Sequence, residues 1–305
     1  MKPPRFAYER ATSVQAALQR LASHGPDIKL LAGGQSLMPM LNFRLLRPLL
    51  LLDINHLAEL QQLQLLDDGT LRLGALLRHQ QVLKAPQVQQ HWPVMAAALA
   101  QIGHLAIRNR GTLGGSLSHA DPAAEWPLLA LLLQARLHLA SAEGSRCIEA
   151  AEFITGAMST ALQPQELLTA VDFPALASGH GWGFAEHARR SGDFAIAAAG
   201  VLLWAEAGRI TQVRIAVGGG VEGACRVPGA EAALVGCPLG VQPGDTVLQR
   251  VLDALRASVQ PNVDLHASAA LRAQIMAAML RQALLAAWAR LPGTGGTDQR
   301  SGSHA

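Results

Sequence analysis

Cysteine is scarce in this sequence, and the few present do not fit a metal or cluster site. Cys147, Cys225 and Cys237 are the only cysteines in 305 residues, and no two of them form a C-x-x-C pair. An iron–sulfur cluster or a structural zinc site typically needs four suitable ligands. The sequence therefore predicts ordinary thiols in a reducing, cytoplasmic compartment and no cluster bound by the chain itself.

Long apolar runs and clusters of one charge are also absent from the sequence. No uninterrupted apolar stretch reaches about 18 residues, the length of a membrane span, because Arg47, Pro48, Gln134 and Arg136 interrupt the two leucine-rich segments. The start, MKPPRFAYER, has no apolar signal region, so we expect no export signal. The formal charge of +3 is spread out without a Lys/Arg run, so we expect neither a membrane span nor a nucleic-acid partner.

Hydrophobic residues, in contrast, make up 50% of the chain, and charged residues only 15%. This composition is ample for a packed interior. Because 305 residues are more than one core usually organises, we expect two domains. Two explanations of the low charge stay open, namely faces covered by partner subunits and a helix-rich core of Ala and Leu.

Hydrophobic spacing predicts alternating helices and strands in the first half of the chain. Thr12 or Ser13 can cap the start of a helix that Gly25 can end. Asp68-Gly69 is typical of the turn of a β-hairpin. The predicted elements are a helix within 12–25, strands at 28–34 and 49–54, a hairpin at 63–74, and helices at 78–84 and 93–102.

The second half of the chain predicts a helix, a hairpin and then a strand-rich region. Pro122 can open the helix at its first turn with Asp121 as the N-cap, and the hairpin is expected within 135–150. A loop-like run at 175–181 marks the domain boundary, which divides the chain into 1–176 and 177–290. Residues 291–305 are expected to form a disordered tail.

Two helices are expected after the strand-rich region. The first starts at about Ala230. The second is long and amphipathic, and its apolar stripe is interpreted as core or interface. The stripe consists of Leu271, Ile275, Met279, Leu284 and Trp288.

Two glycine-containing segments, LLAGGQSLMPML (30–41) and RGTLGGSLSHADPAAE (110–125), carry the functional signal. Each is interpreted as a polar loop with a Gly-Gly pair at the edge of an apolar element. Glycine leaves no Cβ between the backbone and a ligand, and successive N–H groups can form an anion-binding concavity. Gln35, Ser36, Thr112 and Ser116 add neutral donors. The pattern favours a pyrophosphate bound mostly by backbone N–H groups, with no metal required.

Other chemistries fit these residues less well. The lysine of an ATP-binding P-loop and the G-x-G-x-x-G signature of a Rossmann fold are both missing. GGQSLM is not a nucleophile elbow, because Met38 stands where a glycine is needed. His119, Asp121 and Glu125 form an unconvincing metal cluster, since Pro122 interrupts the segment. Asp121 is interpreted instead as a helix cap or ribose acceptor.

The two segments, quoted as LLAGGQSLMPMLNFRLLRPLLLLDIN and IGHLAIRNRGTLGGSLSHADPAAEWP, resemble the FAD-binding medium subunit of the molybdenum hydroxylases. Within that family the chain looks most like the carbon-monoxide-dehydrogenase type. ARRSGDFAIAAAGVLL (188–203) and DLHAS (264–268) extend the resemblance to about residue 290. It implies an α+β fold: a vanillyl-alcohol-oxidase/p-cresol-methylhydroxylase type FAD domain with subdomains of about 1–57 and 58–176, then a smaller α+β domain.

The resemblance also implies which residues bind FAD between the two subdomains. Asp121 matches an acidic position that contacts the cofactor, Ile102 and Leu168 match apolar positions near it, and Phe194 matches an aromatic close to the flavin ring, although a plain core role for Phe194 stays open. The pyrophosphate segments by this matching are Ala32, Gly33, Gly34, Gln35, Ser36 and Leu37, and Thr112, Leu113, Gly114, Gly115 and Ser116. No catalytic acid, base or metal ligand is expected in this chain.

Partner subunits are implied in the same way. The resemblance implies a large subunit with molybdenum–pterin, a small subunit with two [2Fe–2S] clusters, and a dimer of heterotrimers. This chain's FAD would pass electrons to an acceptor. Several relatives carry a lysine where this sequence has Ala185 and Glu186, which leaves the preferred acceptor open. Two rivals stay open: a single-chain flavin oxidoreductase, and a flavin- or nucleotide-binding regulator without partner chains.

Overall fold

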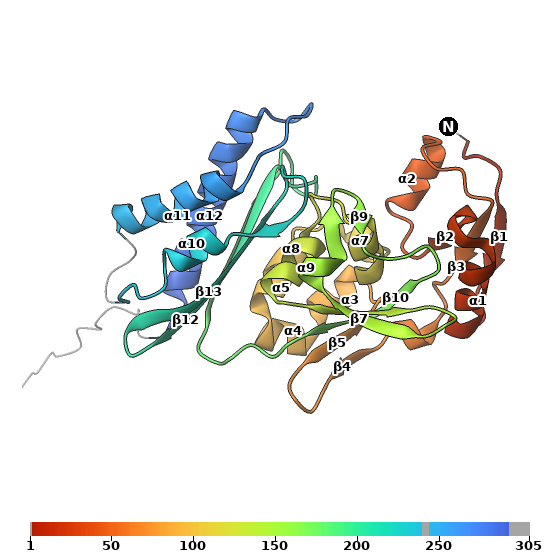
Figure 1. The fold of residues 1–305 in the computed structure, drawn as a ribbon, viewed down its shortest axis with the longest axis horizontal. Coiled ribbons are helices and arrows are strands. Elements are labelled where there is room, and N and C mark those ends of the chain that lie inside the picture. The colour runs from red at the N-terminus through yellow and green to blue at the C-terminus, as the bar shows by residue number, and fades with distance from the viewer. Residues whose placement is uncertain (1, 240–243, 293–305) are drawn as a thin grey trace, which may run out of the picture.

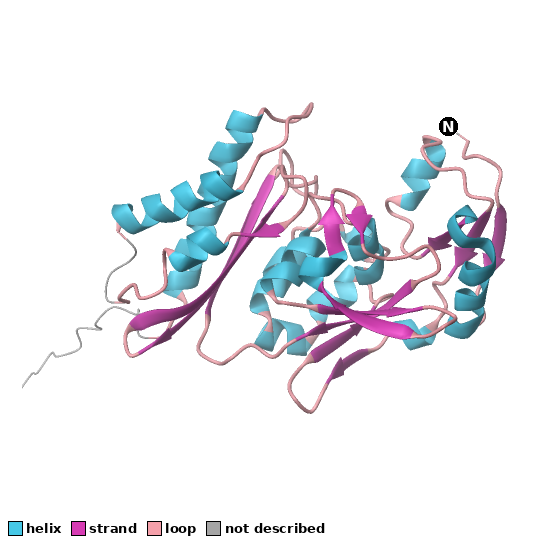
Figure 2. Cartoon of the chain, in the orientation of Figure 1, coloured by secondary structure: helices cyan, strands magenta, loops and turns pink. Residues whose placement is uncertain are grey.

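The computed structural model describes residues 2–239 and 244–292, in which the three larger sheets, of three, five and four strands, follow one another along the molecule, and a fourth sheet has only two strands (Figure 1). The sheet nearest the N-terminus lies at one end, and the helices of the C-terminal region lie at the other (Figure 1). Helices fill the space between the second and third sheets (Figure 2). Most of the predicted tail, 291–305, is outside the described residues, so that prediction is not addressed by the structure.

The first subdomain is a parallel three-stranded sheet in the order β1-β3-β2, and its small core also includes Leu76 and Leu167 of the second subdomain. The predicted helix is confirmed: the Ser13 side chain accepts a hydrogen bond from the N–H of Ala16 at 3.1 Å, and Gly25 ends the helix with φ of 52°. The elements are β1 (Ala7–Arg10), α1 (Val14–His24), η1 (Gly25–Asp27), β2 (Ile28–Leu31), α2 (Leu37–Asn42), β3 (Leu50–Asp53) and η2 (Ala58–Leu60).

The second subdomain contains an antiparallel sheet in the order β4-β5-β10-β6-β7. Both predicted hairpins are confirmed, and in the first the Asp68 carboxylate accepts from the N–H of Thr70 while Gly69 takes a φ of 78°. The strands are β4 (Leu63–Leu65), β5 (Leu71–Gly74), β6 (Arg136–Ala140), β7 (Ser145–Glu149), β8 (Ile154–Gly156), β9 (Ser159–Thr160) and β10 (Leu167–Phe173). The helices are α3 (His79–Lys84), α4 (Pro86–His91), α5 (Pro93–Leu99), α6 (Leu105–Arg108), α7 (Leu113–His119), α8 (Glu125–Leu132) and α9 (Ala150–Phe153).

The helix expected to begin at Pro122 begins later, so that prediction is wrong. Helix α8 starts at Glu125, and Asp121 forms a tight turn in which its carboxylate accepts from the N–H of Ala123 at 2.9 Å. The carbonyl oxygen of Pro122 accepts a hydrogen bond from the N–H of Gly219 and is not part of a helical ladder. A contact from the C-terminal sheet therefore delays the helix.

The C-terminal region is an antiparallel sheet, β11-β12-β13-β14, with helices on both faces (Figure 1). Helix α11 has no counterpart among the predicted elements. The strands are β11 (Gly181–His187), β12 (Ala197–Glu206), β13 (Arg209–Gly218) and β14 (Cys225–Arg226), and the helices are α10 (Pro228–Ala232), α11 (Asp245–Ser258) and α12 (Ala269–Ala289).

The buried stripe of α12 lies about one residue away from the predicted one at its N-terminal end. Leu271 is exposed, and Ile275 and Met279 are half-buried at the edge of the core. Met276 and Leu280 are buried in their place. Of the predicted stripe, the part that is fully buried is Leu284 and Trp288.

Helix α8 joins the two predicted domains into one continuous core. All of its residues are buried, and it packs against β12 and β13. The largest hydrophobic cluster contains Leu129 of α8, Leu73 of the second subdomain and Leu202 of the C-terminal sheet. No helix within 2–239 and 244–292 combines the length and apolarity needed to cross a membrane.

Candidate functional site

The first glycine segment follows the carboxyl end of β2 and leaves its backbone donors free. Gly34 has a φ of 70°, and the Gln35 side chain donates to the carbonyl oxygen of Gly33 at 2.9 Å. Within the described residues, no acceptor takes the N–H groups of Gly33, Gly34, Gln35 or Ser36. Leu37 then opens α2. Consecutive half-exposed donors of this kind form an anion-binding concavity.

The second glycine segment is a helix and not the expected loop. Thr112 caps α7 by accepting from the N–H of Gly115 at 3.2 Å, and its carbonyl oxygen accepts from Ser116 at 3.0 Å. The N–H groups of Leu113 and Gly114 donate to carbonyl oxygens of the loop after β5 at 3.1 and 2.8 Å. The protein itself therefore takes up these backbone donors, and the role of this segment in binding FAD stays a prediction.

The two glycine segments meet. A Cβ on Gly33 would lie 2.5 Å from the carbonyl oxygen of Arg110 and 2.8 Å from the Cα of Gly111. A Cβ on Gly115 would lie 4.0 Å from the Cβ of Ala32. The absence of side chains thus serves close approach between two backbones, one from each subdomain.

A hydrogen-bond network that sequence reasoning missed connects the segments. The Asn55 amide donates to the carbonyl oxygen of Ala32 at 2.8 Å, and its oxygen accepts from Arg78 Nη2 at 2.7 Å. Arg78 Nη1 donates to the carbonyl oxygen of Arg110. One available signal was that Asn55 follows β3, the parallel neighbour of β2, because ligand sites gather at the carboxyl ends of parallel strands. No sequence pattern indicated Arg78.

An open pocket of about 660 Å³ lies at this junction. Burial lowers the pKa of Arg78, and the neighbouring Arg110 guanidinium lowers it further. Two cations therefore share a pocket with unpaired N–H donors, a donor set that fits the diphosphate of FAD. The lining residues used in this argument are Ala32, Gly33, Gly34, Gln35, Asn55, Arg78 and Arg110.

The other predicted cofactor residues lie outside this pocket's lining. Ile102 and Leu168 are buried in the main core, whereas Phe194 is 67% exposed. Phe194 belongs to the segment before β12, which touches the second subdomain, since a Cβ on Gly192 would lie 2.6 Å from the ring of His104. Asp121 is half-buried in its turn. Their contacts with FAD stay predictions.

Ala185 and Glu186, at the position where the resemblance implies a lysine, face opposite ways. Ala185 is buried in the C-terminal core, on the α12 side of β11. Glu186 lies on the opposite face with a buried carboxylate oxygen that finds no hydrogen-bond partner among the described residues. Burial raises the pKa of both Glu186 and Glu125, and their mutual repulsion raises that of Glu125 further. Glu186 on this face of β11 and Glu125 at the start of α8 are therefore both readily protonated.

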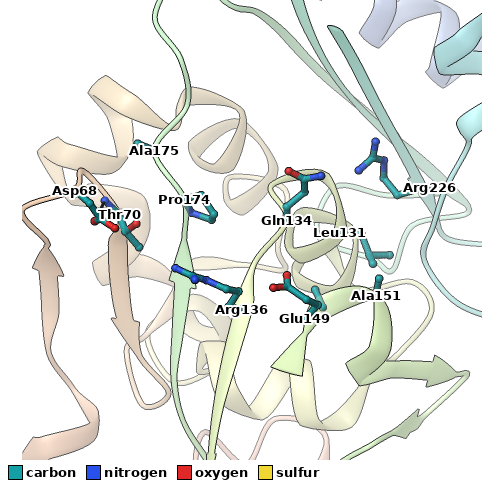
Figure 3. Close-up of a pocket in the computed structure, with 11 residues that line it drawn as sticks. Asp68, Thr70, Leu131, Gln134, Arg136, Glu149, Ala151, Pro174, Ala175 and Arg226 are labelled. Carbon is teal, nitrogen blue, oxygen red and sulfur yellow. Dashed lines mark hydrogen bonds between the residues drawn. The ribbon is translucent and has the colours of Figure 1, made fainter. Parts of the chain in front are cut away.

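A second pocket, of about 730 Å³, opens between the second subdomain and the C-terminal sheet (Figure 3). Its charges come from Asp68, Glu149, Arg136 and Arg226, and the last of these is paired with Glu231 at 2.6 Å. None of the predicted site residues lines it. Its balanced charges do not single out a ligand.

Comparison with known proteins identifies the family. Residues 4–176 match the family described as "FAD binding domain in molybdopterin dehydrogenase", and residues 182–287 match the "CO dehydrogenase flavoprotein C-terminal domain". The 6-hydroxypseudooxynicotine dehydrogenase complex subunit alpha of Paenarthrobacter nicotinovorans is 41% identical over 93% of this chain and 95% of the relative. Caffeine dehydrogenase subunit beta of Pseudomonas sp. strain CBB1 is 42% identical over 85% of this chain and 88% of the relative.

A solved structure agrees with these matches. In carbon monoxide dehydrogenase from Hydrogenophaga pseudoflava, one chain superposes with a TM-score of 0.91 at 35% identity, covering 95% of this chain and all of that one. The α+β fold, FAD as the cofactor and the oxidoreductase class are thereby confirmed. The chain belongs to the family of FAD-binding medium subunits of molybdenum hydroxylases.

Proposed function

We propose that this chain is the FAD-carrying electron-transfer subunit of a molybdenum hydroxylase. It accepts electrons from [2Fe–2S] clusters of a partner subunit and passes them to an external acceptor. The observation that carries the proposal is the pocket at the carboxyl end of β2, whose lining combines Gly33, Gly34 and Gln35, with their unpaired N–H groups, and the two arginines Arg78 and Arg110. Such a pocket holds a diphosphate without a metal.

The residues of this chain bind and orient the cofactor. FAD supplies conversion between two-electron and one-electron transfer. The first glycine segment provides donors, and Asn55 holds this segment against Arg78. No general acid or base is assigned, because flavin reoxidation depends mainly on positioning and hydrogen bonds to the ring.

In this proposal, partner subunits hold the remaining cofactors: a large subunit binds molybdenum, and a small subunit binds the [2Fe–2S] clusters. The three chains assemble as a dimer of heterotrimers. The three cysteines are free thiols at dispersed positions, which supports placing the clusters on another chain. Phe43, Leu45 and Leu49 are exposed around the end of α2. Exposed apolar side chains that gather in one region are typical of surfaces that another subunit covers.

The sequence leaves carbon monoxide, aldehydes, purines and other N-heteroaromatics open as substrates of the complex, and we weigh carbon monoxide against the nitrogen-containing aromatics. The overall likeness to carbon monoxide dehydrogenase supports carbon monoxide. The higher identities, 41% and 42%, belong to relatives named for 6-hydroxypseudooxynicotine and caffeine, compared with 35% for the carbon monoxide enzyme. We therefore place a nitrogen-containing aromatic substrate ahead of carbon monoxide.

Purification of the tagged chain from its native cells tests the proposal. We expect a yellow complex with two further polypeptides, in which metal analysis finds both iron and molybdenum. Reduction of the flavin by a nitrogen heteroaromatic, and not by carbon monoxide, identifies the substrate class. A yellow monomer without metals supports the stand-alone oxidoreductase or regulator, and a colourless chain that does not take up FAD contradicts the proposal.

A further inference from the structure

The candidate diphosphate pocket has more positive charge than the backbone argument requires. In the second glycine segment, the N–H groups of Leu113, Gly114, Gly115 and Ser116 are taken by the protein itself. This segment therefore offers few free backbone donors. Its side of the pocket presents the guanidinium groups of Arg78 and Arg110.

Arg78 is fixed in place by both subdomains. Its Nη2 donates to Asn55 at the end of β3, and its Nη1 donates to the carbonyl oxygen of Arg110. Its backbone forms an isolated β-bridge with Thr112, the residue that caps α7. An arginine held this way loses little further freedom when it binds a ligand, which suits it to bind an anion.

The charges around Arg78 do not cancel. Asp53 also lines the pocket, but its carboxylate already accepts from the Tyr8 hydroxyl at 2.6 Å and from the Asn55 backbone and side chain at 2.9 and 2.7 Å. It makes no ion pair with either arginine, as the described salt bridges show. One half-buried cation, Arg78, and one exposed cation, Arg110, therefore lie near one carboxylate that is otherwise engaged, and an anionic ligand relieves their repulsion.

Building on the proposed FAD function, we propose that Arg78 and Arg110 form a cationic diphosphate subsite that complements the Gly33–Ser36 backbone donors. Arg78 bonds one phosphate while it keeps its contact with Asn55, since a guanidinium has five N–H donors. Arg110 contributes charge from the rim, where its side chain is exposed. Recognition of the cofactor is therefore shared between an uncharged loop of the first subdomain and a charged edge of the second.

Flavin titration of the full chain, freed of its cofactor, tests this subsite. Quenching of flavin fluorescence gives the Kd of FAD at several salt concentrations, and displacement gives the affinities of ADP and adenosine. We expect Arg78→Gln to weaken FAD about tenfold or more, because it removes charge-assisted hydrogen bonds. The salt dependence of Kd becomes shallower in Arg78→Gln and Arg110→Gln. In both variants, the affinity of the chain for ADP falls in parallel with that for FAD, and its affinity for adenosine does not fall.

Matched variants separate charge from architecture. Asn55→Ala breaks the same hydrogen-bond network but leaves both cations, so it weakens FAD without changing the salt dependence. Arg78→Lys keeps a charge and therefore keeps most of the salt dependence. Arg281→Gln removes one exposed charge from α12, away from the pocket, and leaves FAD binding unchanged.

Two results distinguish this inference from the function on which it rests. If Arg78→Gln and Arg110→Gln both bind FAD with wild-type salt dependence and wild-type preference for ADP over adenosine, the cationic subsite is wrong while FAD binding stands. If the wild-type chain binds no FAD at all, the proposed function fails. The preference of the pocket for ADP over adenosine then still decides whether the arginines recognise a diphosphate.

Discussion

Glu125 at the start of α8 and Glu186 in β11 are two carboxyl groups that interact electrostatically. Glu125 is 9% exposed, and its pKa is raised to about 8 by burial and by the neighbouring Glu186. Burial also raises the pKa of Glu186, to about 7. Both groups therefore favour the protonated form in the folded chain, unlike the same groups in an unfolded chain.

Raised pKa values make the folded chain less stable as the pH rises. The contribution of this pair is fully present below about pH 4.5, the ordinary range of Glu, and is lost as the pH approaches 8. We expect the free energy of unfolding, measured with urea, to fall by on the order of 1–3 kcal/mol between pH 5.5 and 8 from this source. Glu125→Gln flattens that dependence. Exposed Glu206→Gln is the control, and an unchanged slope in Glu125→Gln contradicts the assignment.

Gly33 allows the two subdomains to approach each other at the candidate diphosphate pocket. In Gly33→Ala, the new Cβ would lie 2.5 Å from the carbonyl oxygen of Arg110, so the two segments separate. We expect FAD to bind at least about tenfold more weakly, because donors from the two sides no longer converge. Gly244→Ala, at a position with open space around the glycine, serves as the control. Wild-type flavin occupancy in purified Gly33→Ala would show that this approach is not required.

At the scale of elements, α12 lies directly on the backbone of β11. A Cβ on Gly183 would lie 1.9 Å from the carbonyl oxygen of Ala283, and one on Gly181 would lie 2.0 Å from that of Ala287. Alternate residues of β11 thus lack side chains where the helix crosses. Trp182 and Phe184, on the opposite face of the strand, pack against the main core.

Gly183→Ala forces α12 away from the sheet. Because backbone atoms cannot give way as a flexible side chain does, we expect a loss of about 1–3 kcal/mol in unfolding free energy. Chemical denaturation compared with Gly229→Ala provides the measurement, since a Cβ at Gly229 meets only the Ala254 Cβ at an ordinary 3.4 Å. Equal stability of the two variants contradicts the close contact.

The sequence could predict the elements that local signals determine, and it could not predict those that depend on long-range contacts such as this one. Local signals sufficed for α1, with its Ser13 cap, and for the hairpin turn at Asp68-Gly69. They failed for the stripe of α12, because the side facing β11 includes Ala283 and Ala287, whose small side chains permit the backbone contact. They also failed at Pro122, whose carbonyl oxygen bonds to Gly219 from another sheet.

The candidate site was only half predictable for the same reason. Gly33 to Ser36 could be recognised because free donors follow from local sequence, with small and polar residues after a strand. Arg78 could not be recognised, since its position in the pocket depends on the β-bridge with Thr112 and on Asn55 from the other subdomain. Contacts between residues far apart in the sequence produce no periodic pattern of residue types from which they could be predicted.

On the scale of the whole molecule, α8 is a shared hydrophobic element. Gly200 of β12 lets it approach closely, because a Cβ there would lie 2.7 Å from a methyl group of Leu132. Trp126 at its start lies 6.1 Å, ring to ring, from Phe173 of β10. The proposed division at residues 176 and 177 therefore separates two units that share one core.

A fragment of residues 1–178 is expected to be much less stable than the full chain. Removal of the C-terminal sheet exposes Leu128 and Leu132, and each such side chain contributes roughly 1.5–3 kcal/mol when buried. We expect a lower melting temperature, binding of a hydrophobic dye, or aggregation. A fragment that melts cooperatively at the temperature of the full chain would show that the two units are independent.

The same helix also determines how the cofactor can be inserted. Separating the FAD domain from the C-terminal sheet would expose α8 to water, and all residues of this helix are buried. Entry of the cofactor by this route would therefore cost a large amount of free energy. The first subdomain shares its small core with Leu76 and Leu167 of the second subdomain, and the two subdomains also meet at an open pocket. We therefore expect FAD to enter through the open mouth of this pocket, where the bound diphosphate would connect the Gly33–Ser36 segment of one subdomain to Arg78 and Arg110 of the other.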